Sequence, residues 1–217
     1  MTDTITTELH QGMPVYTAGK PLAEARAALV LLHGRGASAH SILNMERYLP
    51  HPDLAYLAPQ AANNTWWPAR FLDPLEQNEA WLDSALQVVD DLVQRIREAG
   101  VPPERIFFGG FSQGAILATE YVARHAQRYG GLFILSGGLF GPPGAERNYT
   151  GSLEGTPVFI GCSDVDPHIP LWRVEETADV LAQSGGAVTK RIYPGMGHLI
   201  NEDEILAVKQ MIDAALA

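Results

Sequence analysis

Short apolar runs alternate with amphipathic stretches along most of the chain. Runs rich in Val, Ile, Leu and Phe predict six strands, and apolar spacing of three and four predicts five helices between them. This alternation is typical of a mostly parallel sheet with helices on both faces. The expected strands are Ala28–Leu32, Leu54–Ala58, Arg105–Phe111, Leu132–Leu135, Pro157–Cys162 and Val188–Tyr193, with an extra edge strand around Val15–Ala18; the expected helices are Ala37–Tyr48, Asn78–Ala99, Gln113–Arg128, Leu171–Ser184 and Glu202–Leu216.

The domain organisation follows from length and continuity. The chain has 217 residues, with no internal repeat and no low-complexity linker, so one domain over 1–217 is expected. One long irregular segment, Pro59–Gln77, contains Trp66, Trp67 and Phe71. Loops of this length in compact domains are usually functional, so we expect this one to shape a binding site.

Composition narrows the class of protein. Hydrophobic residues make up 46% of the chain, but no stretch reads as a membrane span or a signal peptide, so a cytoplasmic protein without stable membrane association is expected. The single cysteine, Cys162, rules out an intramolecular disulfide and a multi-cysteine metal site. A formal net charge of −10 argues against nucleic acid as a partner. The sequence leaves open whether the protein forms a homodimer.

A Gly-x-Ser-x-Gly motif runs from Gly110 to Gly114, where an expected strand meets an expected helix. In such a tight turn the central serine is strained, and glycines two residues before and after it prevent a clash between the crossing backbones. This is the pattern of a nucleophile elbow. It makes Ser112 the candidate nucleophile, with a glycine-rich turn around a bystander serine as the alternative.

A serine nucleophile needs a base, and the base needs an acid that orients it. His198 lies in a glycine-rich loop between the last strand and the last helix, where its side chain can reach the C-terminal edge of the sheet. Asp164 and Asp166 both follow the penultimate strand; Asp166 is preferred because Pro167 fixes the backbone beyond it, whereas Asp164 could equally cap the turn. The order Ser112, Asp166, His198 is that of α/β-hydrolases.

The other histidines are interpreted by their position. His10 and His51 are expected in solvated loops, His40 and His125 on helix surfaces, and His168 at the border of the site.

An oxyanion hole requires two N–H donors near the nucleophile. The backbone N–H of Gln113 follows Ser112 at the start of a helix, and the glycine-punctuated loop His33–Ser38 follows an apolar strand. We therefore expect the backbone N–H groups of Arg35 and Gln113 to be the oxyanion donors. Substitution of either side chain should then affect activity little, unless the loop moves. An ordinary turn is the alternative for this loop.

Four segments together resemble the phospholipase/carboxylesterase family of small α/β-hydrolases, which also contains acyl-protein thioesterases. They are Leu-His-Gly-Arg-Gly from Leu32, Gly-Phe-Ser-Gln-Gly-Ala from Gly110, Asp-Val-Asp-Pro-His-Ile-Pro from Asp164 and Gly-Met-Gly-His from Gly195. The resemblance implies hydrolysis of carboxylic esters or thioesters through an acyl-serine, without metal or organic cofactor and without a large lid domain. The Asp-Pro-x-Ile-Pro pattern supports Asp166.

The resemblance also bears on the substrate. Members that act on long lipid chains usually carry Leu-Gly-Asp after the His-Gly pair, whereas Arg35-Gly36-Ala37 stands here. The family has a Trp-containing loop near the acyl site, which implies that Trp66 lines the pocket; Trp67 could equally pack the loop onto the core. The residues predicted to contact substrate are Trp66, His33 and Ile169.

The sequence thus predicts a carboxylesterase-type serine hydrolase for esters of small to medium acyl chains. A thioesterase, a lysophospholipase and an acyltransferase on the same triad are alternatives. A catalytically idle ligand-binding protein of the same fold is the non-enzyme alternative.

Overall fold

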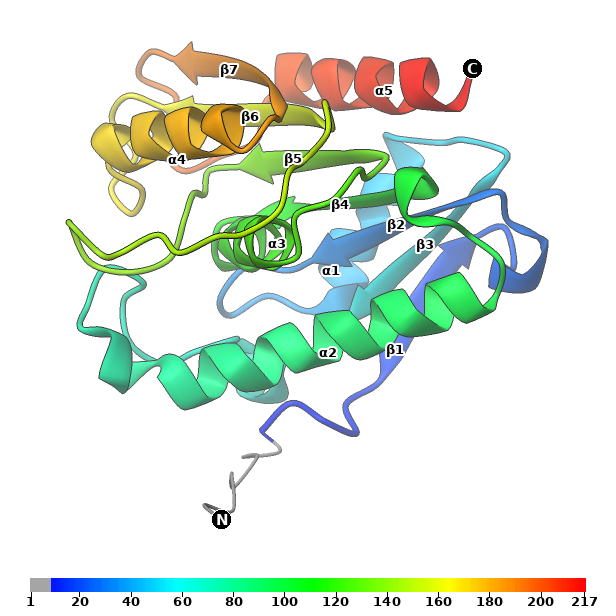
Figure 1. The fold of residues 1–217 in the computed structure, drawn as a ribbon, viewed down its shortest axis with the longest axis horizontal. Coiled ribbons are helices and arrows are strands. Elements are labelled where there is room, and N and C mark those ends of the chain that lie inside the picture. Colours follow the sequence, from blue (N-terminus) through cyan, green and yellow to red (C-terminus); the bar gives the residue numbers. More distant parts are fainter. Residues whose placement is uncertain (1–8) are drawn as a thin grey trace.

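The computed structural model describes residues 9–217, and its centre is a seven-stranded sheet (Figure 1). The strand order is β1-β3-β2-β4-β5-β6-β7. Strand β1 pairs antiparallel with β3, and all other neighbours are parallel. The strands are β1 (Val15–Gly19), β2 (Ala27–Leu32), β3 (Leu54–Pro59), β4 (Ile106–Phe111), β5 (Gly131–Leu135), β6 (Pro157–Ser163) and β7 (Ala187–Tyr193).

Helices cover both faces of this sheet. The three helices α2 (Glu79–Glu98), α3 (Gln113–Arg124) and α4 (Leu171–Gln183) bury their apolar sides in one core, and α2 and α3 lie in front of the strands in Figure 1. The helices α1 (Ala39–Leu43) and α5 (Glu202–Leu216) pack in the core on the other face. The expected α/β fold with helices on both faces is therefore confirmed.

The expected strands match within about one residue, including the edge strand β1, whereas two helices differ in length. Helix α1 ends at Leu43 and continues as the 3₁₀ turn Asn44–Arg47. The predicted apolar side is still buried there, because 3₁₀ and α turns present similar spacings. Helix α3 ends at Arg124 rather than at residue 128, since Ala126 forms a β-bridge with Gly151.

The parallel arrangement positions the candidate site. Strands β2, β4, β6 and β7 all point the same way, so the loops that follow them meet at one edge of the sheet. These loops carry the residues predicted to act in catalysis. None of the helices in the described part of the chain is long and apolar enough to cross a membrane.

Candidate active site

The turn between β4 and α3 has the geometry of a nucleophile elbow. Ser112 lies at φ 56° and ψ −121°, a region that side-chain-bearing residues rarely occupy. A Cβ atom at Gly110 would lie 2.3 Å from the carbonyl oxygen of Leu32, and one at Gly114 would lie 2.0 Å from the same atom. Both positions must therefore be glycine, because strand β2 passes directly against the turn.

Three side chains from three different loops form one hydrogen-bonded chain. The Nε2 atom of His198 lies 2.9 Å from Oγ of Ser112, and its Nδ1 atom lies 2.7 Å from Oδ2 of Asp166. With the proton on Nδ1 donated to the carboxylate, Nε2 is free to accept the serine proton. The ring also packs against Phe111, at 4.6 Å between centroids, which limits its rotation.

The environment of Asp166 keeps it ionised. Its side chain is fully buried, and its Oδ1 atom accepts hydrogen bonds from the backbone N–H groups of His168 and Ile169 at 2.8 and 3.0 Å. Burial by itself raises the pKa of Asp166, but the hydrogen bonds from His198, His168 and Ile169 outweigh it, so the net pKa is lowered. The carboxylate thus faces the imidazole as an anion.

Asp164 has a different place. Its Oδ1 atom accepts a hydrogen bond of 2.8 Å from the backbone N–H of Gly195, and Oγ of the neighbouring Ser163 accepts one of 3.0 Å from Gly197. These two bonds tie the loop after β6 to the loop that carries His198. The structure therefore puts Asp166 on the imidazole and Asp164 on the backbone next to it.

Two backbone N–H groups flank Ser112 without an acceptor. Gln113 is the first residue of α3, so its N–H has no partner within the helix. Among the described residues, the N–H groups of Gln113 and Arg35 donate no hydrogen bond. The loop that carries Arg35 touches the elbow, since a Cβ at Gly34 would lie 3.4 Å from Cβ of Ser112. The geometry is suited to binding an oxyanion next to the serine.

The side chains of the same two residues hold the long loop. Gln113 accepts a hydrogen bond of 2.8 Å from the N–H of Trp66 and donates one of 2.9 Å to the carbonyl of Trp67. The guanidinium of Arg35 donates to the carbonyls of Pro68 and Ala69. Replacing either side chain is therefore expected to move the loop, which the sequence could not indicate.

A cleft of about 470 Å³ opens above Ser112. Its walls come from the loop after β2, the long loop, the elbow, α3 and the segment after β6. The lining residues are Gly34, Arg35, Ala37, Trp67, Arg70, Phe71, Phe111, Ser112, Gln113, Ile116, His168, Ile169 and His198. His168 and Ile169 are therefore part of the cleft wall. Trp67, Phe71 and Ile116 are apolar wall residues that the sequence did not single out as such.

Two residues expected to contact substrate do not line this cleft. Trp66 is fully buried, and its Nε1–H donates to the carbonyl of His33 at 2.9 Å. His33 is itself fully buried, and its Nε2 atom accepts a hydrogen bond of 3.1 Å from Ala61. Trp67 is also buried, at 1% exposure, and packs in the same hydrophobic core as Trp66, but unlike Trp66 it borders the cleft.

His10 also differs from its expected solvated position. It is 1% exposed, its Nε2 atom bonds the carbonyl of Trp66 at 2.9 Å, and its Nδ1 atom accepts from Ala62 at 3.1 Å. Burial lowers the pKa of both His10 and His33, which favours neutral imidazoles. These two histidines are buried groups that hold the long loop by hydrogen bonds to its backbone. Across residues 9–217, no three His, Cys, Asp or Glu side chains are grouped to hold a metal ion.

Comparison with known proteins gives a consistent result. A model of the family described as Phospholipase/Carboxylesterase matches residues 17–216. Acyl-protein thioesterase 1 of Saccharomyces cerevisiae is 27% identical over 215 residues, covering 89% of this chain and 94% of its own. Acyl-protein thioesterase 1 of Cryptococcus neoformans is 26% identical over 220 residues, with 88% and 92% covered.

Solved structures agree with this match. The crystal structure of a phospholipase/carboxylesterase from Dyadobacter fermentans is 42% identical, covers 94% of this chain and 97% of its own, and superposes with a TM-score of 0.89. The Bacillus cereus carboxylesterase, at 19% identity, 99% and 100% coverage and a TM-score of 0.72, shares the fold. The chain belongs to the phospholipase/carboxylesterase family, a family of hydrolases that act on ester bonds.

Proposed function

We propose that this protein is a carboxylesterase-type serine hydrolase that cleaves carboxylic esters of small to medium acyl chains through an acyl-serine intermediate. The observation that carries the proposal is the unbroken path of hydrogen bonds from Asp166 through His198 to Ser112, with distances of 2.7 and 2.9 Å. Such a path activates a hydroxyl that is otherwise a weak nucleophile at neutral pH.

In the first half of the proposed reaction, Oγ of Ser112 attacks the ester carbonyl carbon while Nε2 of His198 accepts the hydroxyl proton. The carbonyl oxygen becomes an oxyanion, which the N–H groups of Arg35 and Gln113 stabilise. The imidazolium then gives its proton to the departing alkoxide as the ester bond breaks. Asp166 remains ionised and holds the ring in position.

In the second half, a water molecule takes the place of the alcohol. His198 accepts a proton from this water, whose oxygen attacks the acyl-serine carbonyl. The second oxyanion occupies the same N–H groups and collapses to release the acid, while the imidazolium returns a proton to Oγ of Ser112. The cycle consumes one water and needs no group beyond the residues of this chain.

The cleft supports a small to medium acyl group. Trp67 packs edge-on against Phe140 at 5.0 Å between ring centroids, so this wall is backed by the core. Together with Phe71 and Ile116 it bounds a volume of about 470 Å³, at the lower end of the range for small-molecule sites.

The direct test is Ser112→Ala. We expect kcat on a p-nitrophenyl ester to fall by about 10⁴-fold or more, since removal of the nucleophile alone disables the triad. The thermal unfolding temperature should change little, because the strained turn is retained. A variant that keeps more than a few per cent of wild-type turnover contradicts the proposal.

A thioesterase is the second candidate, because the curated relatives at 26–27% identity are acyl-protein thioesterases. The two activities use the same triad and differ in the leaving group. Measuring kcat/KM for a matched oxoester and thioester with acyl chains of two to sixteen carbons separates them. A preference for long-chain thioesters would favour the second candidate.

A further inference from the structure

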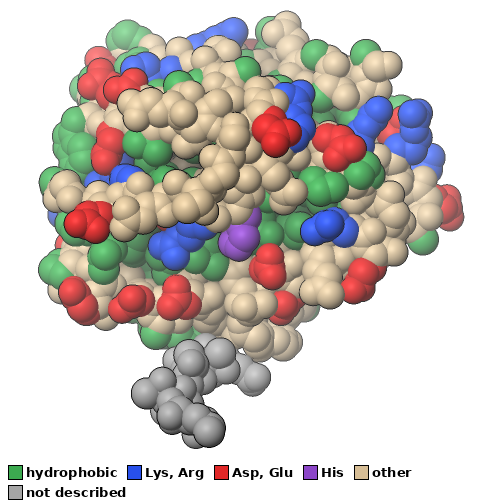
Figure 2. All heavy atoms as spheres, in the orientation of Figure 1, with side chains coloured by type: hydrophobic (Ala, Val, Ile, Leu, Met, Phe, Trp, Pro, Cys, Tyr) green, Lys and Arg blue, Asp and Glu red, His purple; other side chains and the backbone are tan. Residues whose placement is uncertain are grey.

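The walls of the cleft carry an unusual balance of charge. Two arginines, Arg35 and Arg70, line it, and no aspartate or glutamate of the described residues does. The chain as a whole has 25 acidic and 15 basic residues and a formal charge of −10. Figure 2 shows acidic side chains spread over the face that Figure 1 presents, several of them over α2. The cleft is therefore positively charged within a negatively charged protein.

Within residues 9–217, neither guanidinium forms an ion pair with a carboxylate. Arg35 donates to the carbonyl oxygens of Pro68 and Ala69, which are dipoles without net charge. Arg70 is exposed, and neither arginine has an ion-pair partner among the described residues, whereas Arg26, Arg124, Arg147, Arg173 and Arg191 each have one.

The nearby carboxylates do not change this balance. Asp73 accepts a hydrogen bond of 2.9 Å from the backbone N–H of Arg70, and its charge also acts on Arg35, but it lies outside ion-pair distance of both guanidinium groups. Asp166 is fully buried and engaged by His198. Two positive charges thus face the space above Ser112, where they interact with whatever the cleft binds.

We infer that the substrate is an anionic ester, in which the acyl or the alcohol part bears a carboxylate held by the positive charge of Arg35 and Arg70. This inference rests on the proposed esterase function and names its substrate class. A planar guanidinium is well suited to a carboxylate, through two parallel hydrogen bonds or through charge alone. Because Arg35 is held by two carbonyls, Arg70 is the residue free to move onto the anion.

The test uses two matched pairs of esters. The first pair places the charge on the acyl part: mono-p-nitrophenyl adipate against its neutral carboxamide counterpart. The second places it on the alcohol part: the butyrate ester of 3-hydroxybenzoate against that of 3-hydroxybenzamide. The enzyme-free rate is subtracted.

In at least one of the two pairs, we expect kcat/KM to be about tenfold higher for the anionic ester than for the neutral one, mainly through a lower KM. This preference should fall as the salt concentration increases. The pair that responds identifies the charged part.

Variants of Arg70 link the preference to the cleft. Arg70→Gln should reduce the ratio of anionic to neutral kcat/KM by roughly three- to tenfold, and Arg70→Lys should keep most of it. Arg95→Gln is the matched control. It removes the same charge from the exposed face of α2, about 24 Å along the helix from its first residue, Glu79. It should leave the activity and the ratio of anionic to neutral kcat/KM unchanged.

The inference is overturned if neither anionic ester is preferred, or if Arg70→Gln and Arg95→Gln show the same ratio as the wild type. These results are separate from the test of the triad. An enzyme that loses activity in Ser112→Ala but treats the charged and neutral esters alike keeps the proposed function and loses only its anionic substrate class.

Discussion

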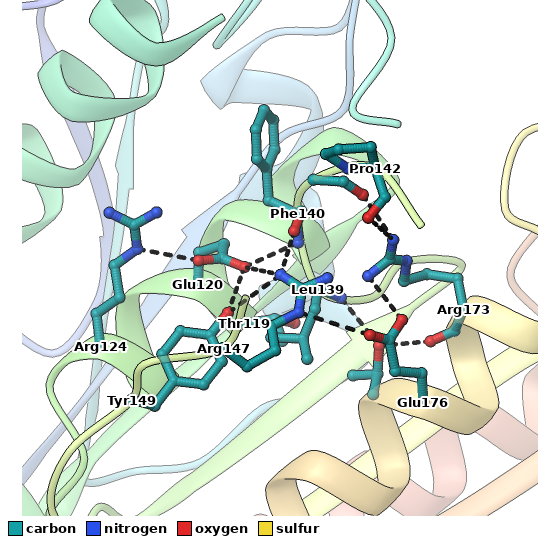
Figure 3. Close-up of polar contacts among 12 residues, drawn as sticks. Thr119, Glu120, Arg124, Leu139, Phe140, Pro142, Arg147, Tyr149, Arg173 and Glu176 are labelled. Atoms are coloured by element: carbon teal, nitrogen blue, oxygen red, sulfur yellow. Dashed lines mark hydrogen bonds and ion pairs between the residues drawn. The ribbon is translucent and has the colours of Figure 1, made fainter. Parts of the chain in front are cut away.

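Two regions of the molecule use arginine in opposite ways. In the cleft, Arg35 and Arg70 are exposed and have no carboxylate partner within the part of the chain that the structure describes. Close by, on the same face of the sheet, a buried ionic cluster joins α3, the segment after β5 and α4 (Figure 3). The cluster consists of Glu120, Arg124, Arg147, Tyr149, Arg173 and Glu176.

In the ionic cluster, three arginines share two glutamates, and its central residues Glu120 and Arg173 are buried. Glu120 is 1% exposed and accepts hydrogen bonds from the N–H of Phe140 and the hydroxyl of Tyr149, both at 2.8 Å. Arg173 is fully buried, donates to the carbonyl of Gly141 at 2.6 Å and pairs with Glu176 at 2.8 Å. Burial lowers the pKa of Arg173 to about 10, as does Arg147 beside it, while the carboxylates act in the other direction.

The difference between the regions assigns a separate role to each. The cluster fixes the backbone of the segment after β5, and through Phe140 it supports Trp67 in the cleft wall. A buried charge that loses its partner is costly, so the cluster should respond to substitution with a loss of stability. Arg35 and Arg70 in the cleft are exposed to solvent, so losing one of these charges should affect activity rather than stability.

The largest expected effect lies in the cleft and compares the two aspartates. Asp166→Asn should lower kcat by about 10³–10⁴-fold, because the amide can no longer hold the productive tautomer of His198. Asp164→Asn loses only a carboxylate that accepts from Gly195, and should lower kcat far less. Steady-state kinetics on one p-nitrophenyl ester decides. Loss of activity in the Asp164 variant alone would reverse the assignment.

The next effect lies in the ionic cluster. Glu120→Gln should lower the free energy of unfolding by about 3 kcal/mol, since it removes the buried anion between Arg124 and Arg147 and leaves Arg147 with only the partly exposed Glu176. Urea denaturation measures this value, and kcat of the folded enzyme should change little. Glu146→Gln, an exposed neighbour, is the control, with an expected change below about 0.5 kcal/mol. Equal effects in the two variants would show that the cluster does not stabilise the fold.

A buried carboxyl without a cationic partner provides a contrast to the cluster. Glu204 is fully buried at the start of α5, its Oε2 atom caps Asn201, and its Oε1 atom has no partner among the described residues. Burial raises the pKa of Glu204 to about 7. A folded-state pKa above the unfolded one means that stability falls as pH rises from about 4.5 to 7.

Glu204→Gln removes this dependence while keeping the capping interaction. The variant should gain stability over the wild type as pH rises from 5 to 7.5, by at most about 3 kcal/mol. Denaturation curves of both proteins across this pH range measure the difference. A difference that does not vary with pH would show that Glu204 is ionised throughout.

The smallest effect concerns the link between the oxyanion donor and the cleft wall. Gln113→Ala removes the side-chain bonds to Trp66 and Trp67 but keeps the backbone N–H, so kcat/KM should fall by about tenfold as the loop loosens. Gln94→Ala, on the exposed face of α2, should have no effect. An unchanged kcat/KM in the first variant would mean that the remaining bonds hold the loop.

Much of the fold and of the triad could be predicted from the chain. The apolar runs located the strands because a strand buried on both faces must be apolar throughout. The elbow was predictable because its backbone geometry demands glycine at Gly110 and Gly114. The last helix was predicted with its observed bounds, Glu202–Leu216, and the structure shows Asn201 at its start accepting from the N–H of Glu204.

The errors have a common physical cause. Trp66 and Trp67 are adjacent, chemically alike and both buried in the core, and only the packing of the long loop decides that Trp67 also borders the cleft. His10 and His33 are buried through contacts with residues more than 20 positions away. The periodicity of apolar residues cannot predict these long-range contacts, because the residues that make them lie in irregular segments.

The sequence by itself therefore determined what is local: the elbow around Ser112, the alternation of strands and helices, and the order of the candidate acid and base. Backbone sterics and the burial of apolar runs act over a few residues, so the chain displays them directly. The tertiary structure alone decided which charges meet. Among residues 9–217, Arg147 and Arg173 pair with carboxylates and Arg35 and Arg70 do not, because ion pairing depends on the distances that the fold sets between side chains.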